Sequence, residues 1–306
     1  MIRKFVYAAA LASAYFTLPA RALEHVIGTV RTDQVVLGYE TYGKQTSALP
    51  LIVVNGGPGL DHRYMTRNKV WQPIAKDRLV VFYDQRGTGT SRHMSPDAAQ
   101  TMDAEVADLD AIRAKLGLQK IALLGHSWGG MIVMAYATAH PDRVERLILC
   151  DSVPATWKAM KGKSFVYYNF YPDVRADDDV NVKSAGTNKD AVATTELIDQ
   201  LHTIFYSSQK REKFLANLGK LGYTPSVSSA LDHSTANIDL RDAISTFQFP
   251  VLVITGRYDT TIEPVVSWDL AHQIPGARLV FMEKSGHFSF YEEPDKFDHE
   301  VRLFLK

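Results

Sequence analysis

The chain has 306 residues, of which 46% are hydrophobic and 22% are charged, with 34 basic and 34 acidic side chains. This length is sufficient to bury a large core, and a single α/β domain of this size is common. Because the charges cancel, nothing in the composition favours binding to nucleic acid or to an acidic membrane surface. Chemistry on a small molecule is therefore the better starting hypothesis.

The N-terminal residues form a segment of a different kind. A basic pair at residues 3–4 is followed by an uncharged, apolar run over residues 5–18, and Ala20 and Ala22 are small residues of the type that signal peptidase reads. The apolar run is shorter than the roughly 20 residues that span a bilayer. We therefore expect residues 1–22 to be a cleaved secretory signal, giving a secreted or periplasmic protein without stable membrane insertion. An uncleaved N-terminal anchor is the alternative.

Short apolar, β-favouring runs alternate with helical patterns in most of the remaining chain. The expected strands are 26–30, 35–42, 51–54, 79–83, 120–124, 144–150, 251–254 and 278–282, and the expected helices are 63–75, 103–116, 131–137, 264–273 and 294–305. Such alternation predicts a mostly parallel, eight-stranded sheet with helices on both faces. We therefore expect an α/β core formed by residues 23–151 and 250–306.

Residues 152–249 do not follow this alternation. They contain an acidic cluster at residues 177–179, scattered aromatic side chains, and helical patterns near 190–206 and 209–221. An unstructured loop of this length is improbable inside a compact domain. We predict that residues 152–249 form an inserted, mainly helical cap over the carboxyl edge of the sheet.

The segment Gly125-His126-Ser127-Trp128-Gly129 joins an expected buried strand to an expected buried helix. Glycine two residues before and two residues after Ser127 permits a turn sharp enough to lift the hydroxyl off the sheet, at a helix N-terminus. Free backbone N–H groups and the helix dipole favour negative charge there. Ser127 is therefore a candidate nucleophile. The alternative, a Gly/Ser-rich turn packed only for shape, leaves its acid and base partners unexplained.

A serine hydroxyl needs a base to take its proton, and the base needs a third group to orient it. His287 follows the last expected strand, and Asp259 follows the preceding one. Both residues lie at the carboxyl ends of parallel strands, where sheets of this type gather active residues. The sequence therefore predicts a catalytic triad of Ser127, Asp259 and His287, with Glu263 as the alternative acid.

Other histidines have less suitable positions. The side chain of His126 is expected to point away from that of Ser127 and to pack in the interior. His140 follows a helix and is expected to lie at the surface or to cap that helix. His202 and His233 fall within the cap segment, where a side chain could touch substrate.

Two backbone amides, those of Gly57 and Trp128, are expected to form an oxyanion hole. Each such donor contributes on the order of 3 kcal/mol in the transition state. The sequence has no Cys/His cluster and no H-E-x-x-H motif, so no metal is predicted. It has no G-x-G-x-x-G motif after a strand, so no nucleotide cofactor is predicted.

Five segments together resemble the proline iminopeptidase branch of the α/β-hydrolase fold, peptidase family S33. They are the elbow at 125–130, the Gly-Gly-Pro-Gly loop at 56–59, the Asp-Gln-Arg-Gly-Thr-Gly-Thr-Ser run at 84–91, and the segments 256–259 and 285–288. The resemblance extends over nearly all of the chain after residue 22 except the cap. It implies an α/β-hydrolase fold and release of an N-terminal residue, often proline, from short peptides, amides or arylamides through an acyl-enzyme. It also implies nucleophile, base and orienting-acid roles for Ser127, His287 and Asp259.

The chain departs from the family pattern in two places. Asn55 stands where the family usually has histidine at the start of the glycine loop, a change that concerns anchoring of the loop more than the oxyanion hole. Members of the family also bind the substrate's α-amine with glutamates from the cap, for which this chain offers Glu196 and Glu212. The alternative for each glutamate is a solvated helix face.

Other functions remain open at this point. A carboxylesterase or amidase with the same triad is the main alternative, and carbon–carbon bond hydrolases share the scaffold. Dehalogenases and epoxide hydrolases of this fold carry aspartate at the elbow, so Ser127 argues against both. A binding protein that has lost turnover would not need all three triad residues. The sequence leaves the oligomeric state open.

Overall fold

The computed structural model describes residues 23–66, 69–160, 187–218 and 222–306. The signal expected over 1–22 and the acidic cluster at 177–179 lie outside these ranges. Within them, no helix is both long and apolar enough to cross a bilayer.

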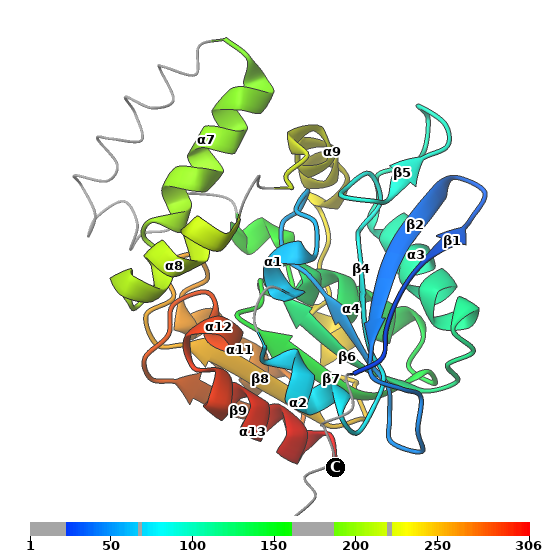
Figure 1. The fold of residues 1–306 in the computed structure, drawn as a ribbon, viewed down its shortest axis with the longest axis vertical. Helices are drawn as coiled ribbons and strands as arrows, with labels where there is room; N and C mark the ends of the chain where they lie inside the picture. Colours follow the sequence, from blue (N-terminus) through cyan, green and yellow to red (C-terminus); the bar gives the residue numbers. More distant parts are fainter. Residues whose placement is uncertain (1–22, 67–68, 161–186, 219–221) are drawn as a thin grey trace, which may run out of the picture.

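One mixed sheet organises the molecule (Figure 1). Its order is β1-β2-β4-β3-β6-β7-β8-β9, with β5 paired to β2, and all pairings from β4 to β9 are parallel. The strands are β1 His25–Arg31, β2 Val35–Tyr42, β3 Leu51–Val54, β4 Val80–Tyr83, β5 Arg92–His93, β6 Ile121–His126, β7 Val144–Cys150, β8 Val251–Gly256 and β9 Arg278–Met282. The predicted eight strands are all present, and β5 is an additional ninth. It has only two residues, too few to carry a periodic signal.

The helices follow the predicted alternation, apart from the region 63–75 and from three helices that were not predicted, at 225–235, 241–244 and 289–292. They are α1 Arg63–Thr66, α2 Trp71–Ala75, α3 Met102–Lys115, α4 Trp128–Ala139, α7 Lys189–Leu201, α8 Ser208–Leu218, α9 Pro225–Thr235, α10 Arg241–Ile244, α11 Pro264–Gln273, α12 Ser289–Glu292 and α13 Pro294–Phe304, with a 3-10 turn at Trp157–Met160. The single helix expected over 63–75 is instead two short helices, α1 and α2. Helices α7 to α10 lie between β7 and β8 in the chain, in the segment predicted to be the cap.

Alternate side chains of each central strand pack into separate cores on the two faces of the sheet. On one face Ile52 and Leu123 pack with α3, α4 and α11, and on the other Val53 and Leu124 pack with α2 and α13. In Figure 1, α2 and α13 lie in front of the sheet. Burial on both faces explains why these strands read as continuous apolar runs.

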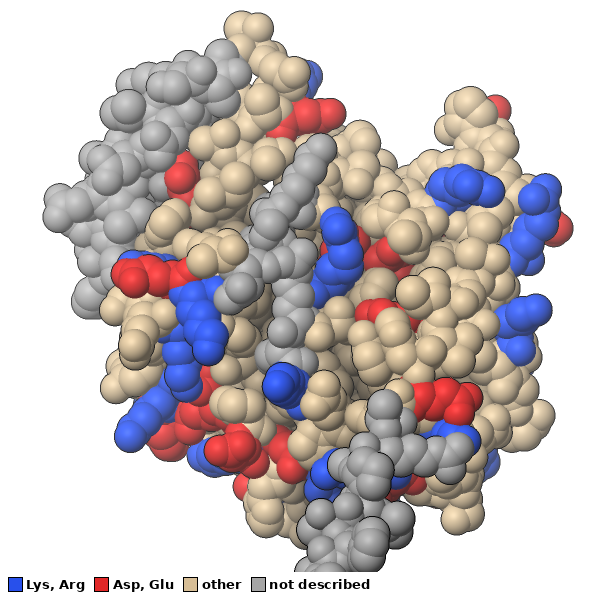
Figure 2. Space-filling model, viewed as in Figure 1, with Lys and Arg blue, Asp and Glu red and all other residues tan. Residues whose placement is uncertain are grey.

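Backbone hydrogen bonds join the segment between β7 and β8 to two loops at the carboxyl edge of the sheet. The Asp61 amide donates to Gly222 O (2.9 Å), and the Thr224 amide donates to Gly59 O (2.8 Å). The His287 amide donates to Ile204 O (2.8 Å). The segment is thus hydrogen-bonded to the loop after β3 and to the loop after β9. On the face drawn in Figure 2, basic and acidic side chains are interleaved, as the balanced composition suggests.

Candidate active site

Ser127 occupies the sharp turn between β6 and α4 that the sequence predicts. Its backbone has φ 54° and ψ −122°, a strained combination for a residue with a Cβ. A Cβ on Gly129 would lie 2.3 Å from Val54 O, and one on Gly125 would lie 2.5 Å from Gly129 O. Glycine is therefore required at both positions, because another part of the backbone lies where a Cβ atom would be. The turn places Ser127 directly before the first residue of α4, with 8% of its surface exposed.

Asp259 and His287 form a buried, hydrogen-bonded pair. His287 Nδ1 lies 2.7 Å from Asp259 Oδ2, and the other carboxylate oxygen accepts the amides of Thr261 (2.9 Å) and Ile262 (3.0 Å). Burial alone would lower the pKa of His287, but the charge of Asp259 and the hydrogen bond to it outweigh burial and raise that pKa above 6.5. Asp259 is therefore a carboxylate hydrogen-bonded to His287 Nδ1, the contact that the sequence predicts for the orienting acid.

The residue before the serine, His126, is the part of the elbow that packs against this pair. In the described part of the chain, no hydrogen bond joins Ser127 Oγ to His287. His126, the residue before the serine, has its ring centroid 4.9 Å from that of His287. In the absence of substrate, catalytic hydrogen bonds are often long or poorly aligned and tighten in the substrate complex.

The glycine loop after β3 is held by side chains on both sides. Asn55 Nδ2 donates to Gly56 O and to Leu60 O, both at 2.8 Å, and Gln85 Nε2 donates to Asn55 O (2.7 Å). Asn55 thus anchors the loop from the position that is usually histidine in the resembling family. Neither the Gly57 amide nor the Trp128 amide donates a hydrogen bond within the described ranges.

A cluster of charged side chains, His62, Asp84 and Glu40, holds the continuation of the same loop. The backbone amide of His62 lies 3.0 Å from Asp84 Oδ1, and Nδ1 of its ring lies 2.6 Å from the same oxygen. Nε2 of His62 lies 2.9 Å from Glu40 Oε1. Burial alone would lower the pKa of His62, but the two carboxylates outweigh it and raise the pKa to about 9. The cluster therefore ties the loop after β3 to β2 and to the loop after β4.

Asp151 is a buried carboxyl that the sequence reasoning missed. It follows β7 with φ 46°, and it accepts the amides of Gly256 (2.8 Å) and Ser289 (3.2 Å) and the Ser289 hydroxyl (3.0 Å). Burial and the nearby charge of Asp259 raise its pKa to about 7. It links the loops that carry Asp259 and His287. Its position could have indicated a role in the site, because Asp151 is an acidic residue directly after a strand, at the same edge of the sheet as Asp259.

Two cavities bear on the search for a substrate site, and the first adjoins the glycine loop. One, of about 250 Å³, is lined by Gly57, Pro58, Leu60, Ala193, Glu196, Leu197, Gln200, Tyr223 and Ser228. Glu196 is an exposed residue of α7, and it lines the same cavity as Gly57, whose amide is a predicted oxyanion donor. Glu212 is exposed on α8 and does not line this cavity.

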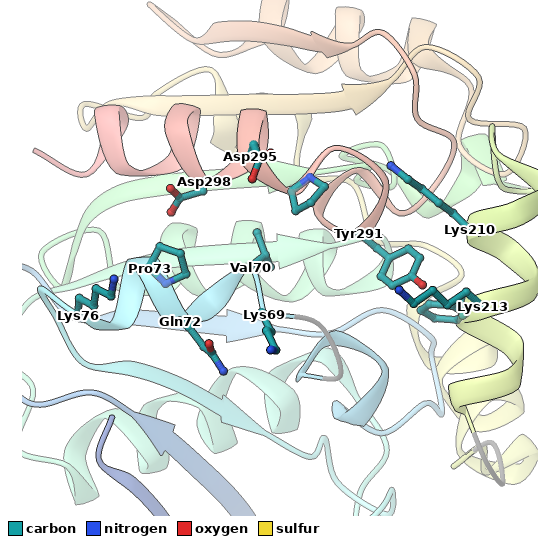
Figure 3. A pocket seen from close by; sticks show the side chains of 12 residues that line it. Lys69, Val70, Gln72, Pro73, Lys76, Lys210, Lys213, Tyr291, Asp295 and Asp298 are labelled. Carbon is teal, nitrogen blue, oxygen red and sulfur yellow. The ribbon is translucent and has the colours of Figure 1, made fainter. Parts of the chain in front are cut away.

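The second cavity, of about 900 Å³, lies among α2, α8, α12 and α13 (Figure 3). Lys210 and Lys213 project from α8 on one side, and Asp295 and Asp298 lie on α13. The lining contains no triad residue and no predicted oxyanion donor. Its position therefore separates it from the proposed chemistry.

The four other histidines that the sequence singled out, His126, His140, His202 and His233, have the following positions. His126 is 2% exposed and hydrogen-bonded at both ring nitrogens, to the Tyr64 hydroxyl and to His287 O. His140 follows α4, with its ring against Tyr136. His202 and His233 are exposed and do not line the cavity that contains Gly57.

Comparison with known proteins is consistent with this arrangement. The family described as the alpha/beta hydrolase fold matches residues 50–294. The proline iminopeptidase of Lactobacillus acidophilus is 28% identical over 292 residues, covering 88% of this chain and 95% of the relative. The proline iminopeptidase of Saccharolobus solfataricus is 26% identical over 310 residues, covering 95% and 96%.

Solved structures show the same fold. An alpha/beta fold family hydrolase from Bacillus anthracis has a TM-score of 0.72 and 25% identity, covering 92% of this chain and 100% of its own. An esterase from Thermogutta terrifontis has a TM-score of 0.68 and 23% identity, covering 92% and 98%. With the family match extending over most of its length, the chain belongs to the α/β-hydrolase fold family.

Proposed function

We propose that this chain is a serine aminopeptidase that releases an N-terminal residue, of the proline type, from short peptides or amides through an acyl-enzyme. The observation that carries the proposal is the cavity that both Gly57 and Glu196 line. A carboxylate there can bind the charged α-amine of a substrate whose carbonyl oxygen points at the Gly57 amide. The similarity to proteins named proline iminopeptidase supports the same substrate class.

In this mechanism the Ser127 hydroxyl attacks the carbonyl carbon of the first residue, and His287 takes its proton. The developing oxyanion accepts hydrogen bonds from the amides of Gly57 and Trp128, which have no competing partner in the described ranges. His287 then gives its proton to the leaving amine, and Asp259 stabilises the imidazolium and holds its Nδ1. Water, deprotonated by His287, attacks the acyl-enzyme and releases the free amino acid.

The first experiment compares free and blocked substrates. Arylamides of proline, alanine and leucine should be cleaved, and cleavage should collapse when the α-amine is acylated, because the cap carboxylate then has no cation to bind. Equal rates on free and acylated substrates would remove the aminopeptidase proposal. Preferential turnover of short acyl esters would instead indicate an esterase with the same triad.

The second experiment tests the amine anchor. Glu196→Gln should raise KM at least tenfold for free-amine arylamides and leave hydrolysis of simple esters unchanged, since an ester without an amine makes no use of the carboxylate. Glu212→Gln is the matched control, because Glu212 is an exposed cap glutamate outside the cavity. An unchanged KM for Glu196→Gln would exclude Glu196 from the substrate site.

A further inference from the structure

Tyr64 and His126 connect two loops that contribute separate parts of the proposed active site. The Gly56 amide donates to the Tyr64 hydroxyl oxygen (2.5 Å), and that hydroxyl lies 2.7 Å from His126 Nδ1. Nε2 of His126 lies 2.8 Å from the backbone oxygen of His287. Three consecutive hydrogen bonds thus run from the glycine loop to the loop of the base, through a helix and the strand that precedes the nucleophile.

The direction of each hydrogen bond follows from its chemistry. A backbone carbonyl can only accept, so His126 Nε2 carries a proton and donates to His287 O. In neutral imidazole the other nitrogen then accepts, so Nδ1 receives the hydrogen of the Tyr64 hydroxyl. The oxygen of that hydroxyl keeps a lone pair for the Gly56 amide. Each of the three donors therefore has one acceptor, and all three hydrogen bonds run in the direction from Gly56 to His287.

The surroundings keep both side chains in these protonation states. Tyr64 is 5% exposed and His126 is 2% exposed. Burial, and after it the nearby charge of His287, lower the pKa of His126 well below 6.5, so its ring stays neutral. Burial raises the pKa of Tyr64 above 10, so its hydroxyl stays protonated. The rings lie in an aromatic cluster with Phe288 and Phe290, which restricts their rotation.

At the other end of this series of hydrogen bonds, Gly56 directly precedes Gly57, whose amide is a predicted oxyanion donor. Gly56 is bonded on both sides, its N–H to Tyr64 and its C=O to Asn55 Nδ2. The C=O of Gly56 and the N–H of Gly57 belong to one planar peptide group, so fixing the first fixes the direction of the second. A shift of Gly56 therefore turns the Gly57 amide away from the position of the oxyanion.

We propose that Tyr64 and His126 are a pair of positioning residues that hold the Gly57 amide and the His287 ring in the arrangement required for acyl transfer. Their hydrogen bonds go to the Gly56 amide and to the backbone oxygen of His287, and the ring of His126 also packs beside the ring of His287, with centroids 4.9 Å apart. The inference rests on the proposed function, because it assigns these two loops to the oxyanion hole and the base. It adds a requirement for three hydrogen bonds, and it gives a role to Tyr64, which lies outside the five segments that resemble the family, and to the side chain of His126.

The test begins with Tyr64→Phe, which keeps the ring and removes the hydroxyl. The matched control is Tyr136→Phe, since Tyr136 is also buried and its hydroxyl donates to Asp110 (2.8 Å), on helix α3. We expect Tyr64→Phe to lower kcat on the arylamide at least tenfold with KM changed less than about twofold, because oxyanion stabilisation acts in the transition state. Tyr136→Phe should keep both constants near wild type, whatever its effect on thermal stability.

A double-mutant cycle with His126→Phe distinguishes a connected pair from two independent packing effects. If the two residues act as one unit, Tyr64→Phe/His126→Phe should be no slower than the slower single variant. Losses that multiply, or a Tyr64→Phe enzyme that matches Tyr136→Phe, would overturn the inference. Should Tyr64→Phe fail to fold, His126→Phe alone carries the comparison with Tyr136→Phe, with the same expected loss of kcat.

The labelling rate of Ser127 by a fluorophosphonate separates this inference from the proposed substrate. The probe needs the nucleophile, the base and the oxyanion hole, but no α-amine. If the wild-type enzyme is labelled but cleaves no arylamide, the aminopeptidase proposal is wrong. The positioning role of Tyr64 can still be tested in that case, because Tyr64→Phe should then be labelled at least tenfold more slowly than wild type. Labelling of Tyr64→Phe at the wild-type rate would defeat the inference, whatever the substrate.

Discussion

Replacing His62 with glutamine removes an imidazolium that lies between two carboxylates beneath the glycine loop. His62 is 6% exposed, with Asp84 Oδ1 at 2.6 Å and Glu40 Oε1 at 2.9 Å from its two ring nitrogens. A glutamine amide can donate to one of these carboxylates, but it carries no charge. The two carboxylates then lose the cation between them, which is costly for buried Asp84 and partly buried Glu40, although Glu40 keeps its contact with His25 Nε2 (2.8 Å).

The pKa of His62 sets the size and the pH range of the effect. Its value is about 9 in the folded chain, against an ordinary 6.5 that we take for the unfolded chain. A difference of about 2.5 pH units corresponds to about 3 kcal/mol of stability. Because the folded pKa is the higher one, this stability is fully present below pH 6.5 and is lost as the pH rises through about 9.

Urea unfolding followed by circular dichroism measures this contribution. His62→Gln should be less stable than wild type by about 3 kcal/mol near pH 6, and the difference should shrink toward zero above about pH 9. His233→Gln is the control, since His233 is exposed on α9, and its curve should follow that of wild type. A stability difference for His62→Gln that is the same at pH 6 and pH 9.5 would refute the charge-based explanation.

Three further predictions concern other parts of the chain. Gly129→Ala forces a Cβ to within 2.3 Å of Val54 O, so it should destabilise the fold by at least about 1–3 kcal/mol in thermal melting; an unchanged Tm would contradict the packing. Asp151→Asn removes a carboxyl whose ionised form raises the pKa of His287, so the acid limb of the kcat/KM profile should move to lower pH. The shift should be small because the pKa of Asp151 is itself about 7, and a limb that moves to higher pH would contradict the reasoning. N-terminal sequencing of exported protein should show loss of residues 1–22; an intact N-terminus would favour the anchor.

The sequence predicted the central strands well because they are buried on both faces, as β3 is at Leu51–Val54, and the partly exposed strands β2 and β9 were also found. Strands β2 and β9 begin and end where the apolar runs do, at 35–42 and 278–282. Strand β5 was missed because its pairing depends on Val35 and Val36, far away in the chain. The helix over 63–75 was predicted as continuous because its apolar pattern continues where the structure has two short helices.

The predicted triad residues share a local signal, since each follows a strand at its carboxyl end, at one edge of the sheet. The structure pairs Asp259 with His287 and places Ser127 at the strained turn. Their supporting residues have no such signal. The role of Tyr64 depends on a partner 62 residues away, His126, which no periodicity or motif indicates.

The sequence does not distinguish Glu196 from Glu212 as an amine ligand, because the resemblance to the family does not extend over the segment that contains them. Both are exposed glutamates on helices between β7 and β8. The structure distinguishes them only through the cavity that Glu196 shares with Gly57. Which side chain approaches the active site depends on how the segment between β7 and β8 packs against the rest of the chain, and local sequence patterns carry little information on such packing.

The crystal structure of the fluorophosphonate adduct tests the central claim most directly. The account predicts phosphorus bonded to Ser127 Oγ, its oxygen within about 3 Å of the Gly57 and Trp128 amides, and His287 Nε2 within hydrogen-bond distance of Oγ. An adduct on another residue, or a phosphoryl oxygen that faces away from both amides, would contradict it.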